Sequence, residues 1–357
     1  MSSRPRTATA EVYGGVSPRV LRLKERLLSA IPEICVERAA LVTESYRETE
    51  SEPIEIRRAR ALEKVLKNMT IFILEDELIV GHQSEKHRCP PVYPETNVEW
   101  IYDDEEWEGF QTRLQNRLMV PGGVKETLRE IADYWEGKTL FKKAWAAFPE
   151  SVRLMRTTGV LSISHEKNMF GHCIPDWGKL LGMGYEGLRK EVANELKGLD
   201  LTDPASLSKY NFLRSLLIII DGSSAFIRRY ASLARKMARA TADPARRREL
   251  EKIGEVCLWI SKKPARGFHE ALQLLWFAHL IFTIESDGRS TSYGRFDQYM
   301  YPYYGKDMEA GNLTREQAQE LLDCWWIKPN ELIHVDDKEH ATFHGGYPNG
   351  WNLVVGG

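Results

Sequence analysis

Cysteine is scarce in this sequence and follows no pairing motif. The 357 residues contain five cysteines and no CxxC pair, the cysteines being Cys35, Cys89, Cys173, Cys257 and Cys324. An odd, widely spaced set without a signal-like apolar segment near the first residue does not resemble the framework of a disulfide-rich secreted domain. The sequence therefore predicts a reduced, cytoplasmic chain.

Long apolar runs and an excess of one charge are also missing. The longest apolar run, ALQLLWFAHLIF, starts at Ala271 and is interrupted by Gln273 and His279. It is about half the roughly 20 residues of a membrane helix, so it predicts a buried core helix and no membrane partner. Because 49 basic residues face 51 acidic ones, no nucleic-acid partner is expected.

The usual nucleotide, zincin and hydrolase motifs do not occur. There is no Walker, Rossmann, HExxH or GxSxG pattern in the sequence. What is present is an ordinary globular composition with 43% hydrophobic residues, which is enough to fill a sizeable core.

Helical periodicity dominates the chain after an aperiodic, polar start. Residues 1–16 are expected to be a flexible arm, and two amphipathic helices should follow, separated at Pro32. Further helices are expected around 54–73, 177–198, 206–240 and on both sides of Pro264. A capping box, Thr314 with Gln317, should begin a helix that stops at Pro329.

Strand signals are fewer. We expect a short strand at 76–80 before a proline-rich loop, and a strand and loop over 157–173 that lead into a helix capped by Asp176. The last residues, 345–357, alternate toward a strand. An apolar strand is a poor place for a domain to finish, so we expect the chain to be cut there.

The segment FGHCIPDWGKLL, 170–181, combines several reactive residue types. His165, His172 and Cys173 suggest zinc, but a structural zinc site needs four ligands and no second His/Cys pair lies nearby in sequence, so no metal is expected. Neighbouring residues on a strand point to opposite faces, which disfavours a Cys173–His172 nucleophile pair. By spacing alone, His172 is interpreted as a satisfied core or loop histidine.

Two further segments concentrate polar residues and glycine. SDGRSTSYGRFDQYMYPYY, 286–304, is either an ordered loop that lines a polar pocket or a structural loop stapled by Arg295 and Asp297. HGGYPNGWN, 344–352, has glycines that allow close backbone approach, and Tyr347 offers a hydroxyl. Both interpretations of the first segment remain open at this stage.

Several motifs, in this order along the chain, resemble a known family. EDELIVGHQ, YPETNVEWI, GHCIPDWGKLL, PARGFHEALQLLWF, GRFDQYMYPYY, LTREQAQELLDCWWIKPNEL and FHGGYPNGWNLVVGG together are similar to the N-terminal part of glycyl radical enzymes of the pyruvate formate-lyase superfamily. The resemblance covers about 21–357. GRFDQYMYPYY favours the branch of glycerol and propanediol dehydratases, choline lyase and hydroxyproline dehydratase.

The resemblance implies an α/β fold: the N-terminal half of a ten-stranded barrel wrapped by helices, predominantly helical in this chain. Residues 17–357 would form an incomplete pyruvate-formate-lyase-type domain that stops before the cysteine loop and the radical-glycine domain. ICVE, 34–37, mimics the Gly-Cys-Val-Glu loop of the family, but it is expected to lie within a helix and lacks the glycine, so Cys35 is interpreted as a decoy. No catalytic residue is therefore expected in this chain.

The resemblance also implies site residues and partners. His172, Ser290 and Tyr347 match substrate-contacting positions and favour a small polyol, and Ser164 stands where some relatives have an aromatic residue. The implied cofactor is a protein-derived glycyl radical in the missing C-terminal part, and the implied partners are a radical-SAM activating enzyme and a second copy in a homodimer. The function expected is a lyase or dehydratase of anaerobic metabolism, with the chain inactive alone. The alternative is a non-catalytic split subunit or binding module.

Overall fold

The computed structural model describes residues 15–161, 171–343, 345–347 and 349–356, and within these it is mostly helical. Ser17 caps the first helix by accepting a hydrogen bond from the Val20 amide, and Pro18 stands at its first turn, where the missing amide has no partner to lose. The N-terminal helices are α2 (Pro18–Ser29), α3 (Glu37–Glu48) and α4 (Ile54–Asn68), with the expected break around Pro32.

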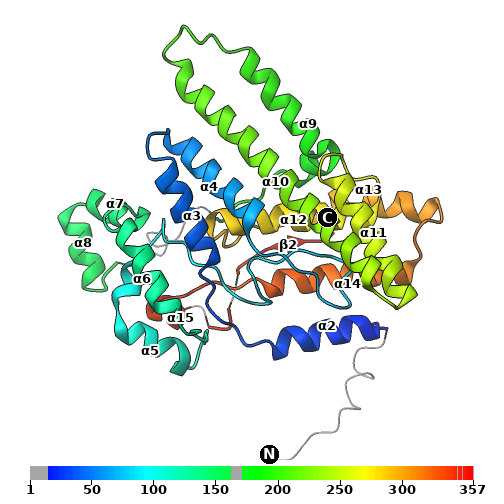
Figure 1. The fold of residues 1–357 in the computed structure, drawn as a ribbon, viewed down its shortest axis with the longest axis horizontal. Helices are drawn as coiled ribbons and strands as arrows, with labels where there is room; N and C mark the ends of the chain where they lie inside the picture. Colours follow the sequence, from blue (N-terminus) through cyan, green and yellow to red (C-terminus); the bar gives the residue numbers. More distant parts are fainter. Residues whose placement is uncertain (1–14, 162–170, 344, 348, 357) are drawn as a thin grey trace, which may run out of the picture.

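A group of short helices follows and lies to one side of the molecule (Figure 1). These are η1 (Glu99–Tyr102), α5 (Asp104–Thr112), α6 (Val124–Trp135), α7 (Leu140–Ala147) and α8 (Glu150–Thr157). The apolar face of α6 is buried, and the Trp135 indole donates a hydrogen bond at 2.8 Å to the Thr43 hydroxyl in α3. This contact joins the group to the N-terminal helices.

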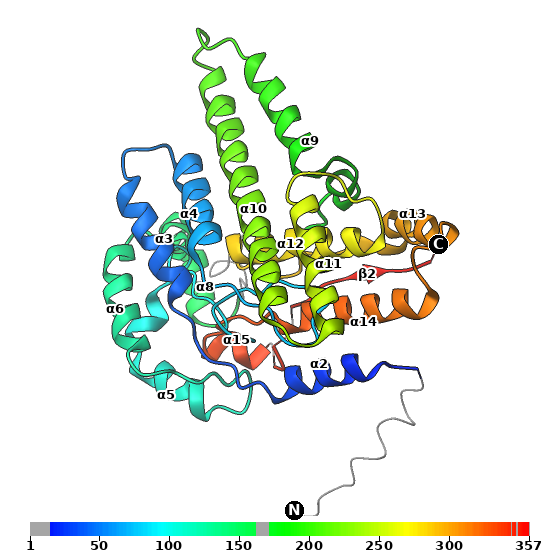
Figure 2. The ribbon, with the colours of Figure 1, turned by 45° about the vertical axis from the view of Figure 1, so that its right-hand side comes forward.

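Two long helices form a hairpin that projects from the body (Figures 1 and 2). They are α9 (Trp177–Lys197) and α10 (Ser206–Ala240); α10 packs against α4 and against α11 (Pro244–Ile260). Asp176 caps α9 through the Lys179 amide, as the sequence predicted. Gly184, at φ 62°, kinks α9 where the chain crosses the backbone of Lys263, an approach that leaves no room for a Cβ.

The central helix α12 (Phe268–Ser286) is the buried apolar run of the sequence, and 271–277 are all buried. No helix among the described residues is both long enough and apolar enough to cross a membrane. The remaining elements are β1 (Gly294–Arg295), α13 (Phe296–Glu309), α14 (Arg315–Glu331), α15 (Lys338–Phe343) and β2 (Leu353–Val354). β1 and β2 pair in parallel, Gly294 with Leu353 and Arg295 with Val354.

Several local expectations are wrong. Residues 76–80 form no strand, because the Val80 backbone exchanges both hydrogen bonds, at 2.8 Å, with the Gln273 side chain of α12 instead of with another strand. Cys35 lies in a bridge to Pro91 and not in a helix. α14 continues two residues past Pro329. The strand expected over 157–173 is absent from 157–161, and 162–170 lie outside the described residues.

The barrel is not visible as such. Apart from isolated bridges, the described residues contain a single two-stranded sheet, so a ten-stranded barrel remains a prediction. The capping box of α14 is confirmed, since the Thr314 hydroxyl accepts from the Gln317 amide and the Gln317 side chain accepts from the Thr314 amide.

Candidate functional site

Three segments that are far apart in the sequence lie side by side at the predicted site. The His172 amide donates to the Arg289 carbonyl at 2.9 Å, and the Ser292 amide donates to the Cys173 carbonyl at 2.8 Å. On the other side of the same segment, the Ser290 amide donates to the Asn349 carbonyl at 2.8 Å. The segment around Ser290 therefore joins the segment of His172 to that of Tyr347.

The backbone at these positions is unusual. His172, Ser290 and Tyr347 have φ of 55°, 58° and 58°, the left-handed region that non-glycine residues seldom adopt. Such conformations cost free energy and persist only where the surroundings hold them. Of the four other described non-glycine residues with positive φ, Arg88, Asn116 and Asp287 contact these segments or their neighbours, and Asp76 pairs with Arg22 elsewhere. Left-handed backbone is thus concentrated at the predicted site.

Asp336 is the residue that connects two of the three segments. One of its carboxylate oxygens accepts from the Arg289 guanidinium at 2.6 Å and the other accepts from the Asn116 amide at 2.8 Å. The Asn116 side-chain oxygen in turn accepts from the amides of Gly346 and Tyr347, at 2.8 and 2.9 Å. A single buried carboxylate therefore fixes the segment of Arg289 relative to that of Tyr347.

Charges around Arg289 are balanced within this network. Burial alone would lower the pKa of Arg289, but the carboxylates of Asp336 and Asp287 raise it above its ordinary value. Burial would raise the pKa of Asp287, but the neighbouring His334 imidazole and Arg289 lower it. The ion pair that fixes the loop 286–304 is therefore Arg289 with Asp336. Of the predicted pair, Asp297 instead accepts from the Gly356 amide, and Arg295 is exposed.

The side chain of Tyr347 is held and does not point freely into a cavity. Its hydroxyl donates to the Arg117 carbonyl at 2.6 Å, and the Arg88 guanidinium lies 5.2 Å from its ring centroid. Burial raises the pKa of this hydroxyl. Tyr347 lines a cavity of about 420 Å³ together with Tyr293, Asn349, Gly350 and Trp351, among others.

Ser290 and His172 are not among the residues that line this cavity with Tyr347. The Ser290 hydroxyl packs directly against Gly350, where a Cβ would approach it to 2.5 Å, and the His172 side chain is exposed. Ser164 lies outside the described residues. The structure thus brings the segments of His172, Ser290 and Tyr347 together, but it does not direct all three side chains into one cavity. Their roles remain predictions.

A second polar cluster was not foreseen from the sequence. Lys328 of α14 donates to Glu77 at 2.7 Å and to Glu331 at 2.6 Å, and His82 lies between the same carboxylates at 2.9 and 3.3 Å. All four side chains are buried. The signal that could have found it, a lysine and a glutamate three residues apart on an apolar helix, is too common to be specific.

Charges of opposite sign support one another in this cluster. Burial opposes every charge in it, yet Lys328 and His82 lower the pKa values of Glu77 and Glu331, and these carboxylates raise those of Lys328 and His82. The Lys328 ammonium contacts both carboxylates that a divalent cation would need.

The chain is similar to one protein family and to several proteins of known name. The family model PFL-like, pyruvate formate lyase-like, matches residues 11–357. The chain is 36% identical over 347 residues to the probable dehydratase YbiW of Escherichia coli K12, covering 96% of this chain and 42% of that protein. It is 35% identical over 352 residues to an isethionate sulfite-lyase of Desulfovibrio desulfuricans, covering 95% and 42%.

A solved structure agrees with these matches. The glycerol-bound form of the B12-independent glycerol dehydratase from Clostridium butyricum superposes with a TM-score of 0.93 and 38% identity, covering 97% of this chain and 43% of that chain. The chain therefore spans less than half the length of the relatives it matches.

Proposed function

Because the chain belongs to the pyruvate formate lyase-like family of glycyl radical enzymes, we propose that it acts as the N-terminal part of a glycyl radical lyase or dehydratase. The reaction is the elimination of water, or of another small group, from a small hydroxylated substrate. The observation that carries this proposal is the similarity to the glycerol dehydratase over 97% of the chain, combined with the convergence of the three predicted site segments.

The radical groups come from outside these 357 residues in this proposal. No Gly-Cys-Val-Glu loop and no Arg-Val-Xaa-Gly-Tyr motif occurs in the sequence. When present, a glycyl radical and its partner cysteine supply hydrogen-atom abstraction from the substrate. A radical-SAM enzyme is the proposed activator, and a homodimer the proposed assembly.

In this proposal the chain contributes one side of the substrate pocket, the substrate wall, which consists of the segments of His172, Ser290 and Tyr347. A neutral His172 imidazole can donate one hydrogen bond and accept another, which suits it to orient a hydroxyl group as it leaves. Ser290 offers a hydroxyl to the substrate. Tyr347, whose own hydroxyl is bound to Arg117, contributes its ring and its backbone.

The chain also keeps the residues of the substrate wall in fixed positions. Radical intermediates react with whatever reaches them, so the pocket has to be closed and its residues fixed. The Arg289–Asp336–Asn116 network holds the loop of Ser290 and the segment of Tyr347 at a set separation. We propose that these three residues position the wall and do not touch the substrate.

The test uses the complete polypeptide encoded from Met1 through the natural stop codon. We expect its coding frame to contain a Gly-Cys-Val-Glu loop and a distal radical-glycine motif, and anaerobic activation to give a glycyl radical by electron paramagnetic resonance. Glycerol and propane-1,2-diol should then be dehydrated. A frame with neither motif would contradict the enzyme proposal and favour the non-catalytic subunit.

A further inference from the structure

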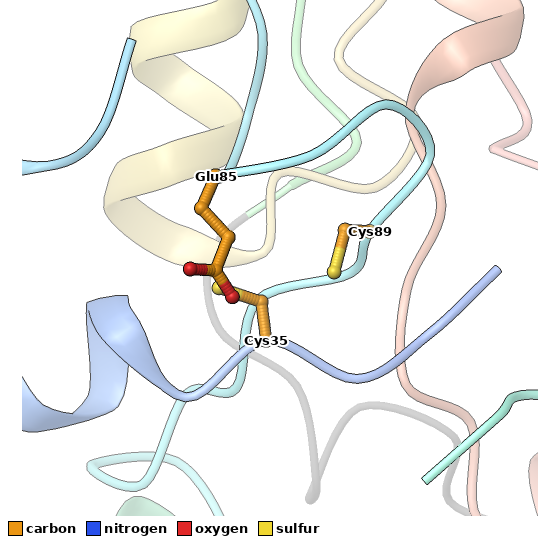
Figure 3. A group of neighbouring side chains, drawn as sticks. All are labelled: Cys35, Glu85 and Cys89. Atoms are coloured by element: carbon orange, nitrogen blue, oxygen red, sulfur yellow. The ribbon is translucent and has the colours of Figure 1, made fainter. Parts of the chain in front are cut away.

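Three side chains of metal-ligand type meet at the loop that carries Arg88. The thiols of Cys35 and Cys89 and a carboxylate oxygen of Glu85 all lie within 4.8 Å of one another. Figure 3 shows Glu85 extending from its loop toward Cys35, with the sulfur of Cys89 beside them. Both thiols are buried, each 1% exposed, whereas Glu85 is exposed. The cluster therefore has a closed sulfur side and a carboxylate on the solvent side.

The backbone fixes both thiols before any ligand arrives. The Cys35 amide donates to the Pro90 carbonyl at 3.0 Å in a parallel bridge. The Cys89 carbonyl accepts from the Ser84 hydroxyl and from the Gln83 amide. Between these residues the loop turns at Arg88, with φ 53°. Because the two sulfurs sit on braced backbone, little ordering remains to be done when a ligand binds.

The pKa values of the two thiols are shifted in opposite directions. A hydrogen bond from Cys89 lowers the pKa of Cys35 against the opposing effect of burial, and the amides of Glu37 and Glu85 add to this. The same hydrogen bond, with burial, raises the pKa of Cys89. A divalent cation between the sulfurs would displace the thiol protons, including the one that Cys89 donates to the Glu33 carbonyl at 2.6 Å, and would neutralise both thiolates.

We propose that Cys35, Cys89 and Glu85 bind one thiophilic divalent cation of the Zn²⁺ type, with a water molecule in the fourth position. Two thiolates select zinc-like ions over Mg²⁺ or Ca²⁺, which prefer oxygen ligands only. The thiols lose their protons to solvent and no redox change is involved. The cluster of Glu77, His82 and Glu331 differs, because Lys328 already contacts both of its carboxylates.

The role of this ion is structural. It cross-links the segment before α3 to the loop that carries His82 and Arg88, and Arg88 lies over the Tyr347 ring. By fixing the loop of Arg88, the ion would also fix the contact between Arg88 and the ring of Tyr347. The sequence alone predicted no metal, because the ligands are separated by up to 54 residues and form no spacing motif.

The experiment titrates Cd²⁺, a spectroscopic substitute for Zn²⁺, into the whole 357-residue chain kept reduced with a phosphine. We expect one equivalent to bind with thiolate-to-cadmium charge-transfer absorption, and Zn²⁺ to displace it. Cys35→Ser and Cys89→Ser should abolish the absorption. Cys324→Ser, which removes a buried thiol of α14, is the matched control and should keep it.

Glu85→Gln tests the third ligand, which is the least buried of the three. Loss of an outer-shell partner already weakens metal affinity about 10–100-fold, so loss of this carboxylate should weaken Cd²⁺ binding at least about tenfold. Saturating Zn²⁺ should also raise the unfolding temperature of the wild type and not that of Cys35→Ser. No stoichiometric uptake by the wild type, or equal uptake by Cys35→Ser, would overturn the site; equal affinity in Glu85→Gln would overturn the three-ligand assignment.

Discussion

Lys328 of α14 contacts both carboxylates of the buried cluster that it forms with Glu77, His82 and Glu331. It contacts Glu77 and Glu331 at 2.7 and 2.6 Å, and Lys328→Met would leave two carboxylates and one histidine without it. Breaking a buried ion pair by removing one partner costs about 3–5 kcal/mol. We expect the free energy of unfolding by urea to fall by about that amount.

The matched control is Lys209→Met on the surface of α10. Lys209 pairs with Glu195 at 3.0 Å, but both side chains are more than half exposed. Exposed pairs contribute little, so this variant should unfold like the wild type. If both lysine variants lost equally little stability, the buried cluster would not be held by its charges.

His279 makes stability depend on pH. It is fully buried among aromatic rings, with Tyr293 and Trp351 each 4.7 Å away between centroids. Burial, with a smaller contribution from His334, lowers its pKa to about 3. In the unfolded chain a histidine titrates near about 6.5. Below that pH the unfolded chain takes up a proton that the folded protein does not.

The stabilising contribution of a neutral His279 is therefore complete above pH ~6.5 and is lost as pH falls toward its folded pKa. His279→Phe should flatten the decline of unfolding free energy in this window by up to about 1.4 kcal/mol per pH unit. Urea titrations at several pH values measure the slope. The control is His340→Phe. Asp337 raises the pKa of His340, so the contribution of His340 to stability is lost as the pH rises, and its removal should not flatten the decline at low pH. An unchanged slope in His279→Phe would contradict the role given to His279.

At the scale of elements, α9 begins where its cap is. Asp176 accepts from the Lys179 amide at 2.9 Å, and replacing such a cap by alanine costs about 0.5–2 kcal/mol. We expect Asp176→Ala to destabilise the protein by this amount in thermal unfolding. Glu191→Ala, at an exposed position within the same helix, should have a smaller effect. A larger loss in Glu191→Ala would show that the cap does not set the stability of α9.

The helices could be predicted from the sequence because their signals are local. Apolar periodicity, the Thr314 capping box and the Asp176 cap each act within one or two turns. The errors lie where long-range contacts decide. Residues 76–80 bind the side chain of Gln273, and Cys35 bridges to Pro91, and neither contact leaves a pattern in its own segment.

The predicted site shows the same division. His172, Ser290 and Tyr347 were identified by motif resemblance, and their segments do meet. Asp336 and Asn116, which hold those segments, belong to no motif, and their partners are 47 to 231 residues away. Positive φ at serine, histidine and tyrosine also depends on tertiary contacts, so it could not be read from residue type.

At the scale of the whole molecule, part of the surface is apolar. Tyr301, Trp326 and Val355 are 68%, 54% and 69% exposed, and within the described part of the chain no further strand pairs with the outer edges of β1 and β2. Exposed edges and apolar patches favour association. We expect the isolated chain to self-associate with increasing concentration, as measured by light scattering during gel filtration. A monodisperse monomer at all concentrations would contradict this expectation.

We propose that this chain supplies the substrate-contacting segments of His172, Ser290 and Tyr347 in a glycyl radical dehydratase. The most direct measurement is steady-state dehydration of glycerol by the complete, anaerobically activated enzyme, comparing His172→Ala with the wild type at equal glycyl-radical content. Positioned proton-transfer and hydrogen-bonding groups typically contribute about 10²–10⁴-fold to rate. We predict a loss of kcat/KM of at least about 100-fold with the radical signal preserved; unchanged kinetics in His172→Ala would contradict the account.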